Sequence, residues 1–265
     1  MLNASIVVYS QHSKINHFKL EILAKLVDNL SSHPLLSSLL IVDNSPFPYF
    51  SRLASYPNIF YHHSPENVGY GAGHNLSRQF LSPQKYHLIV NPDIDLISPN
   101  VINILIDYLE QQAQVCMIQP QITTIGSGEI QHLCKLNPTL FAQVSRLLIS
   151  LFPRIRFLKY YNNRYIMLDK AYNEEIISSS YLSGCFMLCR TKNLDQVGWF
   201  DERFFMYLED ADLTRSLSNI GECLHYPKVK IGHLWARQSY SSPFLFLVAI
   251  HSFIKYSMKW GLKLI

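Results

Sequence analysis

Residues 4–42 read ASIVVYSQHSKINHFKLEILAKLVDNLSSHPLLSSLLIV, and this stretch decides the fold. The runs at 4–9 and 38–42 are short, apolar and rich in β-branched residues, as buried strands are. Between them, residues 15–30 carry apolar side chains at helical spacing. Strand, helix and strand with continuously apolar strands is typical of a parallel sheet covered on both faces. The stretch therefore predicts an α/β fold with a mostly parallel central sheet flanked by helices.

Further strands are predicted along the chain, and polar residues follow several of them. These strands cover residues 58–62, 86–90, 115–119, 181–190 and 222–226. In open α/β sheets, ligands bind beyond the carboxyl ends of the strands. Asp43 follows the strand at 38–42 and lies at such an end, where a carboxylate can accept hydrogen bonds from a nucleoside. An Asx turn at the strand exit explains the same residue equally well.

The segment 66–75, ENVGYGAGHN, concentrates glycines and polar side chains. The glycines are Gly69, Gly71 and Gly73, and the polar residues include Asn67, His74 and Asn75. Glycine lets the backbone approach a ligand closely, and a helix predicted at 76–81 would present its N-terminus to a phosphate. The spacing matches neither the Walker pattern nor the dinucleotide fingerprint. An ordinary turn is the alternative interpretation.

Polar residues alternate just past the strand at 86–90. Asn91, Asp93 and Asp95 stand two residues apart, and in extended chain such residues share a face. Oxygen ligands at a strand end suit Mg²⁺ or Mn²⁺ carrying a diphosphate, because hard cations take carboxylates together with phosphate oxygens. The alternative is a capped turn into the next predicted helix, at 100–112. That helix already has a Ser-Pro start signal of its own, so the aspartates are not needed for it.

The segment 204–215, FFMYLEDADLTR, places Glu209, Asp210 and Asp212 in apolar surroundings. The inward stripe of the predicted helix consists of apolar residues at helical spacing, namely Leu213, Leu217 and Ile220. Gly221 is the expected stop signal. A carboxylate that faces a core costs several kcal/mol unless something pairs with it, so we expect a cation, a metal or a reacting proton nearby. The alternative is that these acids merely stabilise a helix N-terminus through its dipole.

Two isolated positions add to this pattern. Gly184 interrupts the apolar strand at 181–190 and marks a place where another group approaches closely. His233 lies downstream of both acidic clusters. A single imidazole can complete an oxygen-rich metal site, although a structural histidine is the simpler explanation.

Composition narrows the class of protein. The chain has 265 residues, 48% of them hydrophobic, which is enough for the core of one large domain or of one domain with an appendage. Five cysteines without a CxxC pair or a metal-ligand spacing predict buried thiols in a reducing compartment. The sequence shows no signal peptide, and no uninterrupted apolar run reaches the ~18 residues of a spanning helix. We therefore expect a cytoplasmic protein.

The formal charge of +4 is unevenly distributed. Basic residues cluster at 146–164 and 255–263, whereas acidic residues gather near 201–212, which indicates an anionic surface or ligand on one side. Nucleic-acid binding is not expected, because the basic residues accompany long aliphatic runs and no known nucleic-acid-binding module is present.

The C-terminal tail, 244–265, has an amphipathic pattern. One polar stripe recurs every four residues, at His251, Lys255, Lys259 and Lys263, against apolar and aromatic residues. The pattern predicts a helix at a membrane interface. The alternative is a helix packed on the domain with a solvated lysine face. The chain accordingly divides into residues 1–240 and a C-terminal helix at 241–265.

Taken in order, the motifs resemble one enzyme family. IVVYS, VDNS, ENVGYGAGHN, VNPDID, SGCFMLCR and GWFDERFFMYLEDADL occur in the order found in family 2 glycosyltransferases of the GT-A fold, and within them in bacterial rhamnosyltransferases of O-antigen and surface-polysaccharide synthesis. The resemblance covers about residues 4–240. Asn91 stands where many members have the first aspartate of an Asp-x-Asp motif.

The resemblance implies a role for each matching residue. Asp210 would be the catalytic base and Glu209 its catalytic partner, whereas Gly184 and Asp212 would orient groups or contact the acceptor. The donor-binding residues would be Tyr9, Asp43, Asn67, Gly69, Gly73, Asn75, Asn91 and Asp93. The metal ligands for Mg²⁺ or Mn²⁺ would be Asp93, Asp95 and His233.

The resemblance also implies a reaction. An inverting transferase would move a sugar, with L-rhamnose from dTDP-L-rhamnose favoured, onto a polyprenyl-diphosphate-linked glycan at the cytoplasmic side of the inner membrane. Transfer of another sugar, such as galactofuranose or an N-acetylhexosamine, is an alternative. So are a nucleotidyltransferase, although residues 10–14 lack the glycine that its loop needs, and an inactive scaffold that binds sugar nucleotides.

Overall fold

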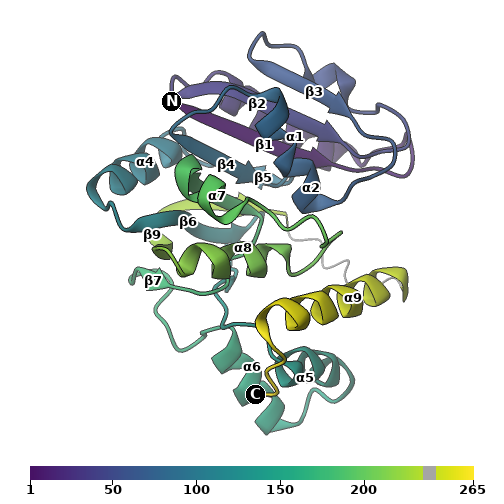
Figure 1. Ribbon diagram of the computed structural model, residues 1–265, viewed down its shortest axis with the longest axis vertical. Helices are drawn as coiled ribbons and strands as arrows, with labels where there is room; N and C mark the ends of the chain where they lie inside the picture. The colour runs from purple at the N-terminus through teal and green to yellow at the C-terminus, as the bar shows by residue number, and fades with distance from the viewer. Residues whose placement is uncertain (235–242) are drawn as a thin grey trace.

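The computed structural model describes residues 1–234 and 243–265, which form one sheet with helices on both faces (Figure 1). The strands are β1 (Leu2–Val8), β2 (Leu36–Asp43), β3 (Ile59–His63), β4 (Tyr86–Val90), β5 (Ile94–Asp95), β6 (Val115–Thr124), β7 (Ile177–Ser178), β8 (Phe186–Arg190) and β9 (Glu222–His233). The helices are α1 (His17–Ser31), α2 (Tyr70–Asn75), α3 (Ser77–Phe80), α4 (Val101–Gln111), α5 (Leu140–Leu151), α6 (Arg156–Tyr165), α7 (Thr191–Val197), α8 (Glu209–Ser218) and α9 (Pro243–Trp260).

The sheet has the order β3-β2-β1-β4-β8-β6-β9-β5, and β7 also pairs with β9. The strands β3, β2, β1 and β4 are mutually parallel, and so are β6 and β9. β8 lies antiparallel between β4 and β6, and the short strands β5 and β7 run antiparallel to β9. The α/β class and the flanking helices are confirmed, and the sheet is more mixed than its sequence predicts.

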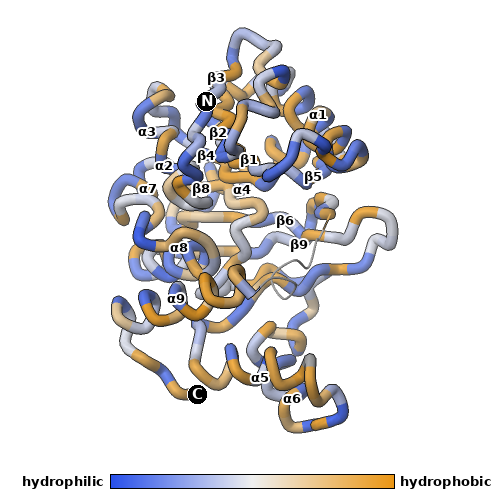
Figure 2. The backbone as a smooth tube through the Cα atoms, turned by 90° about the vertical axis from the view of Figure 1, so that its right-hand side faces the viewer, coloured by the Kyte–Doolittle hydropathy of each residue, from blue (hydrophilic) through white to orange (hydrophobic). Residues whose placement is uncertain are grey.

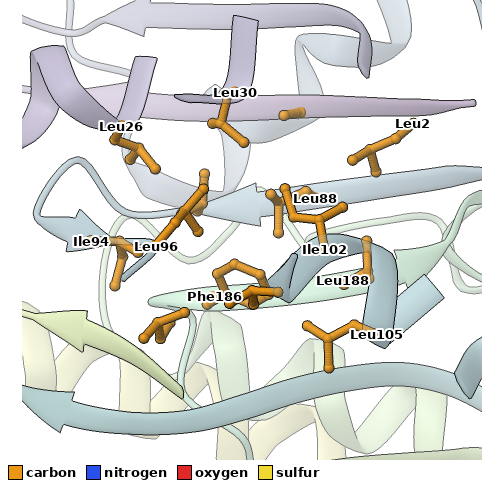
Figure 3. Packing of buried hydrophobic residues seen from close by; sticks show 14 of the residues in the cluster. Leu2, Leu26, Leu30, Leu88, Ile94, Leu96, Ile102, Leu105, Phe186 and Leu188 are labelled. Atoms are coloured by element: carbon orange, nitrogen blue, oxygen red, sulfur yellow. The ribbon is translucent and has the colours of Figure 1, made fainter. Parts of the chain in front are cut away.

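Apolar side chains alternate between the two faces of the central strands. Leu88 of β4 belongs to a core under α1 and α4, which includes Leu26, Ile102 and Phe186 (Figure 3). Its neighbour Ile89 belongs to a second core, under α7 and α8. Since both faces are covered by helices, the central strands bury apolar side chains on both faces, as their hydrophobic runs predict.

The helix predicted at 76–81 is observed as α3, and residues 70–75 of the glycine-rich segment form a further helix, α2, that was not expected. A side chain at Gly71 or Gly73 would start 2.8 Å from an atom of Phe200 or Val7, respectively. These glycines therefore let α2 pack closely on β1 and on the segment before α8.

The stop signal expected at Gly221 does not mark the end of the helix that precedes it. α8 ends at Ser218, before Gly221. Gly221 instead allows close packing, since a side chain there would start 2.3 Å from the Cys116 sulfur.

α9 packs against α8 through buried polar contacts. The Asp212 side chain of α8, 1% exposed, accepts from Lys259 Nζ at 2.8 Å and from Trp260 Nε1 at 2.7 Å. Arg215 of α8 lies 4.3 Å from the Trp260 ring centroid and donates to the Tyr256 hydroxyl at 3.0 Å. The two helices are therefore joined by charged and aromatic groups along one side of α9.

Lys255 and Lys259 of the polar stripe thus face the domain, next to the buried Tyr256 and the partly buried Phe253 and Trp260. His251 and Lys263 are exposed, and so are many apolar side chains of α9. Lys255 also donates to the domain, at the Arg203 carbonyl. The most exposed apolar residues of α9 and the C-terminus are Phe244, Leu247, Ile254, Met258, Leu262, Leu264 and Ile265, each at least 52% exposed. The helix is thus packed on the domain, as the alternative interpretation expects, but two of its lysines contact the domain and many of its apolar side chains are exposed.

The C-terminal segment connects this surface to α5 and α6. The backbone amides of Leu140 and Phe141 donate to the carbonyls of Lys263 and Leu264 at 2.9 and 3.0 Å. α5, α6 and the loop between them expose Leu151, Phe152, Phe157 and Tyr160, each at least 54% exposed. We call these side chains, together with the exposed ones of α9 and the C-terminus, the apolar face. α5, α6, α9 and the C-terminus lie at one end of the molecule, where much of the chain is hydrophobic (Figures 1 and 2).

Asp212→Ala is expected to lower the free energy of unfolding by about 3 kcal/mol, because Lys259 and Trp260 lose the buried acceptor that they share. Urea unfolding followed by circular dichroism measures the change. The control is Glu110→Ala, which breaks an ion pair with Lys85 whose side chains are 47% and 48% exposed, and which should cost at most about 1 kcal/mol. Equal losses in the two variants would contradict a structural role for the Asp212 contacts.

Candidate active site

Asp93 and His233 are brought together by the pairing of β5 with β9. Ile94 pairs with His233, and the Leu234 amide donates to the Asp93 carbonyl at 3.0 Å. The His233 Nε2 atom lies 3.4 Å from Asp93 Oδ1, with side chains that are 8% and 22% exposed. Two residues separated by 140 positions in the sequence thus form one polar site at the end of the sheet.

Gln131 fixes the orientation of the His233 ring. The Gln131 Nε2 group donates to the His233 carbonyl at 3.1 Å, so its Oε1 atom is the one that lies 2.8 Å from His233 Nδ1. An amide oxygen can only accept, and therefore Nδ1 carries a proton. In neutral His233 the lone pair then lies on Nε2, which faces Asp93.

This arrangement fits a divalent cation. Asp93 Oδ1 is buried and has no hydrogen-bond partner among the described residues. A carboxylate oxygen beside an imidazole lone pair needs a proton or a cation between them, and imidazole and carboxylate are both ligands for Mn²⁺-type ions. No group of three or more His, Cys, Asp or Glu side chains within residues 1–234 and 243–265 is arranged for a metal. The remaining ligands would be oxygens from a bound diphosphate and water.

The structure does not bring the Asp95 carboxylate to this pair. Its Oδ1 atom lies 2.9 Å from Lys25 Nζ of α1 and accepts from the Ile97 amide at 3.2 Å. A turn at Pro92 and Asp93 interrupts the extended chain on which the expected alternation depends.

Asp210 lies in the first turn of α8, after two residues in the left-handed region. Tyr207 and Leu208 have φ of 71° and 64°, so the chain turns sharply into the helix. The Asp210 carboxylate accepts from the Gly184 amide at 3.0 Å and from the Ala211 amide at 2.9 Å. It is therefore held by backbone donors at a fixed position.

Gly184 has close neighbours on two sides. A side chain there would start 3.3 Å from Asp210 Cβ and 3.2 Å from the Tyr70 hydroxyl oxygen. The Tyr70 hydroxyl donates to the Gly184 carbonyl at 2.5 Å. The close approach that the sequence predicts at this glycine is thus one between Tyr70, Gly184 and Asp210.

The Asp93 and Asp210 regions meet at residues 184 and 185. The Asn91 amide donates to the Cys185 carbonyl at 2.9 Å, next to the Gly184 amide that binds Asp210. Burial raises the pKa of the Cys185 thiol to about 12, and Asp93 and Asp210 both contribute to this rise. Both carboxylates are thus within electrostatic range of the same thiol.

Glu209 differs from Asp210 in its burial and its hydrogen bonds. It is 6% exposed, and its Oε2 atom has no hydrogen-bond partner among the described residues. Burial, reinforced by the Asp210 carboxylate, raises the pKa of Glu209 well above its ordinary value. Burial likewise raises the pKa of Tyr70, with Glu209 the next contribution. The neutral acid is therefore the favoured form of Glu209.

The Asp43 carboxylate accepts hydrogen bonds from groups within the protein. The side chain is fully buried, and accepts from the Ser45 amide at 2.9 Å, the Phe50 amide at 3.2 Å and the Tyr61 hydroxyl at 2.6 Å. The contact with Ser45 is an Asx turn. Tyr9, 54% exposed, lies next to this turn, because the amide that follows it in the chain donates to the Ser45 hydroxyl at 2.9 Å.

The predicted donor residues of the glycine-rich segment make contacts inside the molecule. Asn67 accepts from the Gly69 amide at 3.2 Å. Asn75, 6% exposed, accepts from the Phe200 amide at 3.1 Å and donates to the Phe200 carbonyl at 2.9 Å. Gly69, at φ 93°, and Gly73 serve the close packing of α2. These residues join α2 to the segment that precedes α8.

Two hollows lie elsewhere on the described surface. One, of about 310 Å³, is lined by residues 83–85, 190–192 and Asp195, at the opposite end of β4 and β8 from Asp93. Another, of about 250 Å³, lies between Phe205 and α9. Neither is lined by Asp93 or Asp210, so the candidate site rests on converging polar groups and not on the size of a cavity.

Sequence reasoning missed Gln131 and Tyr70. Nothing local to Gln131 indicates that it binds His233, which lies 102 residues away in the sequence. Tyr70 is the aromatic residue between the first two glycines of the segment at 66–75, and its position there could have marked it as a contact.

The chain is similar to known glycosyltransferases in sequence and in fold. No family model matches the chain. The chain is 22% identical to rhamnosyltransferase WbbL of Escherichia coli, over 80% of this chain and 78% of the relative. It is 26% identical to the N-acetylglucosaminyl-diphospho-decaprenol L-rhamnosyltransferase of Mycobacterium tuberculosis, over 85% of this chain and 80% of the relative.

Solved structures give the same fold. The crystal structure of GalNAc-T7 with UDP, GalNAc and Mn²⁺ matches with a TM-score of 0.63 at 13% identity, over 98% of this chain, which spans about half (48%) of the GalNAc-T7 chain. The mannosyltransferase PcManGT of Pyrobaculum calidifontis, with GDP-Man and Mn²⁺, matches with a TM-score of 0.58 at 12% identity, over 98% of this chain and 71% of that chain. The chain is therefore a glycosyltransferase with the GT-A fold, and its resemblance to the rhamnosyltransferases is confirmed.

Proposed function

We propose that the protein transfers L-rhamnose, with inversion, from dTDP-L-rhamnose to a polyprenyl-diphosphate-linked glycan. The observation that carries this proposal is that the segments of Asp93 and Asp210 meet at residues 184 and 185, where the Asn91 amide binds the Cys185 carbonyl and the Gly184 amide binds Asp210. One side of this junction offers ligands for a nucleotide diphosphate with its cation, and the other offers a base. The names of the E. coli and M. tuberculosis relatives favour rhamnose as the sugar.

Asp210 acts as the general base. Its carboxylate would accept the proton of an acceptor hydroxyl as that oxygen attacks the anomeric carbon from the face opposite the diphosphate. The new glycosidic bond forms as the bond to the diphosphate oxygen breaks, so a single in-line displacement inverts the anomeric configuration. The Gly184 and Ala211 amides hold the carboxylate in place during this step.

Glu209 supports this assignment by remaining neutral. A neutral acid beside Asp210 does not add a second negative charge to the site, so one carboxylate is left to take the proton. Gly184 keeps the space beside Asp210 open, because any side chain there would press on Asp210 and Tyr70. Asp212, whose carboxylate binds α9, orients α8 instead of contacting the acceptor.

Asp93 and His233 would hold Mg²⁺ or Mn²⁺ together with the donor diphosphate. The bound ion would neutralise the negative charge that develops on the leaving diphosphate. Gln131 keeps His233 Nε2 directed at Asp93 and thus holds the pair ready. Asn91 lies beside this pair through its backbone contact with Cys185. The exposed ring of Tyr9 and the Asp43 turn would contact the nucleoside.

The apolar face would rest on the membrane that carries the acceptor. Large contiguous apolar patches on soluble proteins mark interaction sites. Basic residues in and beside α6 accompany this face, namely Arg154, Arg156 and Lys159, and such cations favour anionic lipid headgroups. No helix in the described part of the chain combines the length and apolar character needed to cross a bilayer. The proposed association is therefore peripheral, on the cytoplasmic side of the inner membrane.

Asp210→Asn is expected to lower kcat by about 10²–10⁴-fold, because the amide cannot take the proton of the acceptor. The affinity for dTDP, measured by thermal shift, should not change. Asp107→Asn, an exposed carboxylate on α4, is the matched control and should retain full activity. Turnover near the wild-type value in Asp210→Asn would exclude Asp210 as the base.

EDTA should suppress transfer, and Mg²⁺ or Mn²⁺ should restore it. His233→Ala should raise the Mn²⁺ concentration for half-maximal activity at least tenfold, and Gln131→Leu should do so more weakly, because it only disturbs the ring orientation. Calorimetric titration of Mn²⁺ in the presence of dTDP provides a readout independent of turnover. His17→Ala, an exposed histidine on α1, is the control. Full activity in chelator would refute the metal site.

Phe157→Ser and Met258→Ser are expected to weaken binding to vesicles of phosphatidylglycerol and phosphatidylethanolamine several-fold each, because each removes an apolar side chain from the bilayer contact. Co-sedimentation with the vesicles measures the bound fraction. Phe18→Ser, 50% exposed on α1, removes an equally large side chain outside the apolar face. If all three variants sediment like the wild type, the apolar face does not bind membranes.

A further inference from the structure

Lys135 and Arg146 act electrostatically on the segment that binds Asp210 and have no part in the mechanism above. We call these two residues the cationic pair. Lys135 precedes α5 and Arg146 lies on α5, and both residues are partly buried. Neither side chain has a carboxylate within 4.0 Å among the described residues, whereas Lys25, Lys85, Arg203 and Lys259 all do. Cations removed from water without a carboxylate partner are costly, so their retention beside a reaction site requires an explanation.

Backbone contacts place Lys135 at a junction. Its amide donates to the Tyr181 carbonyl at 2.9 Å, and its Nζ atom lies 4.2 Å from the centroid of the Tyr181 ring. The next amide, of Leu136, donates to the Tyr165 carbonyl at the end of α6, at 2.9 Å. Tyr181 begins the short segment that ends at Gly184, which binds Asp210. Lys135 therefore stands between the α5–α6 unit and the base.

The charges of this junction act on one another. Burial lowers the pKa of Lys135 to about 8, with Arg146 adding to the decrease and Asp210 opposing it. Burial raises the pKa of Tyr181 well above its ordinary value, with Asp210 adding to the rise and Arg146 opposing it. Both cations and the base are thus within electrostatic range of the same tyrosine.

Two further polar side chains belong to the same junction. The Tyr165 hydroxyl, on a residue that is 3% exposed, has the Gln143 side chain as its hydrogen-bonding neighbour. Arg146 and Asp210 both influence the pKa of Tyr165, which burial raises, so this hydroxyl belongs to the same junction. The junction therefore contains two cations and a buried tyrosine hydroxyl, and such groups together can bind an anion.

We propose that Lys135 and Arg146, with the Tyr165 hydroxyl, bind the diphosphate of the lipid-linked acceptor. The proposal rests on the proposed function and deepens it. Along such an acceptor, the order is sugar, diphosphate and lipid. Along the protein, the order is Asp210, the cationic pair and then α5 and α6 with the apolar face. The two orders match, so the sugar hydroxyl would reach Asp210 while the lipid lies on the apolar face.

The test compares two acceptors that share a sugar. One is farnesyl-diphospho-N-acetylglucosamine, and the other is octyl N-acetylglucosaminide, which carries no phosphate. Lys135→Met and Arg146→Met should each raise KM for the diphosphate acceptor at least tenfold and leave kcat, the donor KM and the KM for the neutral acceptor unchanged. Lys135→Arg should restore most of the affinity. Lys228→Met, an exposed lysine on β9, is the control and should change none of these constants.

Calorimetric titration with farnesyl diphosphate tests the site without turnover. The wild type should bind it, and the double variant Lys135→Met/Arg146→Met, which thermal unfolding must show to be folded, should bind at least a hundredfold more weakly. Unchanged KM for the diphosphate acceptor, or equal increases for both acceptors, would overturn the proposal while the transferase function stands. If the wild type transfers no sugar to either acceptor, the proposed function fails. In that case the titration with farnesyl diphosphate alone tests whether Lys135 and Arg146 bind a diphosphate. Equal binding by the wild type and the double variant would refute this anion site.

Discussion

The antiparallel pairing of β5 with the end of β9 is the contact on which the candidate site depends. It consists of two residue pairs, Ile94 with His233 and Asp95 with Gly232. Gly232 makes it possible, because a side chain there would start 2.8 Å from Ile125 and 3.4 Å from Asp95 Cβ. Without this pairing the chain after β4 would have no reason to approach His233, since β4 itself pairs with β1 and β8. A two-residue strand thus brings a carboxylate to an imidazole.

The three acids of α8 show how the same side chain acquires different properties from its surroundings. Glu209 is buried without a partner, and burial favours its neutral form. Asp210 accepts two backbone hydrogen bonds and lies at the junction with the Asp93 region. Asp212 is buried against Lys259 and Trp260 of α9. The expectation that charge in an apolar segment needs a partner is met by α9 for Asp212 and by backbone amides for Asp210. For Glu209, burial raises the pKa and thereby favours the neutral acid.

Much of the fold could be predicted from the sequence, because apolar periodicity is local. The strands at 38–42, 58–62 and 86–90 and the helix at 100–112 lie within two residues of their observed bounds. The glycine-rich segment was interpreted as a loop because the groups that require its glycines, such as Val7 and Phe200, are distant in the sequence.

The site was predictable only in part, because its residues are also brought together by contacts between distant parts of the sequence. The residue types and their order identified the acids and His233 through a resemblance to known enzymes. Which of them meet depends on the pairing of β5 with β9 and on the turn at Asp93, neither of which leaves a periodic signal. The direction of Asp95, towards Lys25, follows from that turn. The role of Gln131 could not be predicted from the sequence for a further reason. That role depends on its contact with the His233 ring, and no pattern around Gln131 indicates this contact.

The orientation of α9 links the two ends of the proposed reaction. A helix with one polar and one apolar side buries its apolar side when it packs on a soluble domain. α9 packs with Lys255 and Lys259 towards the domain, where Asp212 supplies a buried counter-charge. These charged groups of α9 therefore contact α8 and the segment before it. Exposing apolar side chains to water costs free energy, and this cost is offset only if another apolar phase covers them. A bilayer that carries the acceptor is such a phase, and the helix that would touch it is bonded to the helix that carries Asp210.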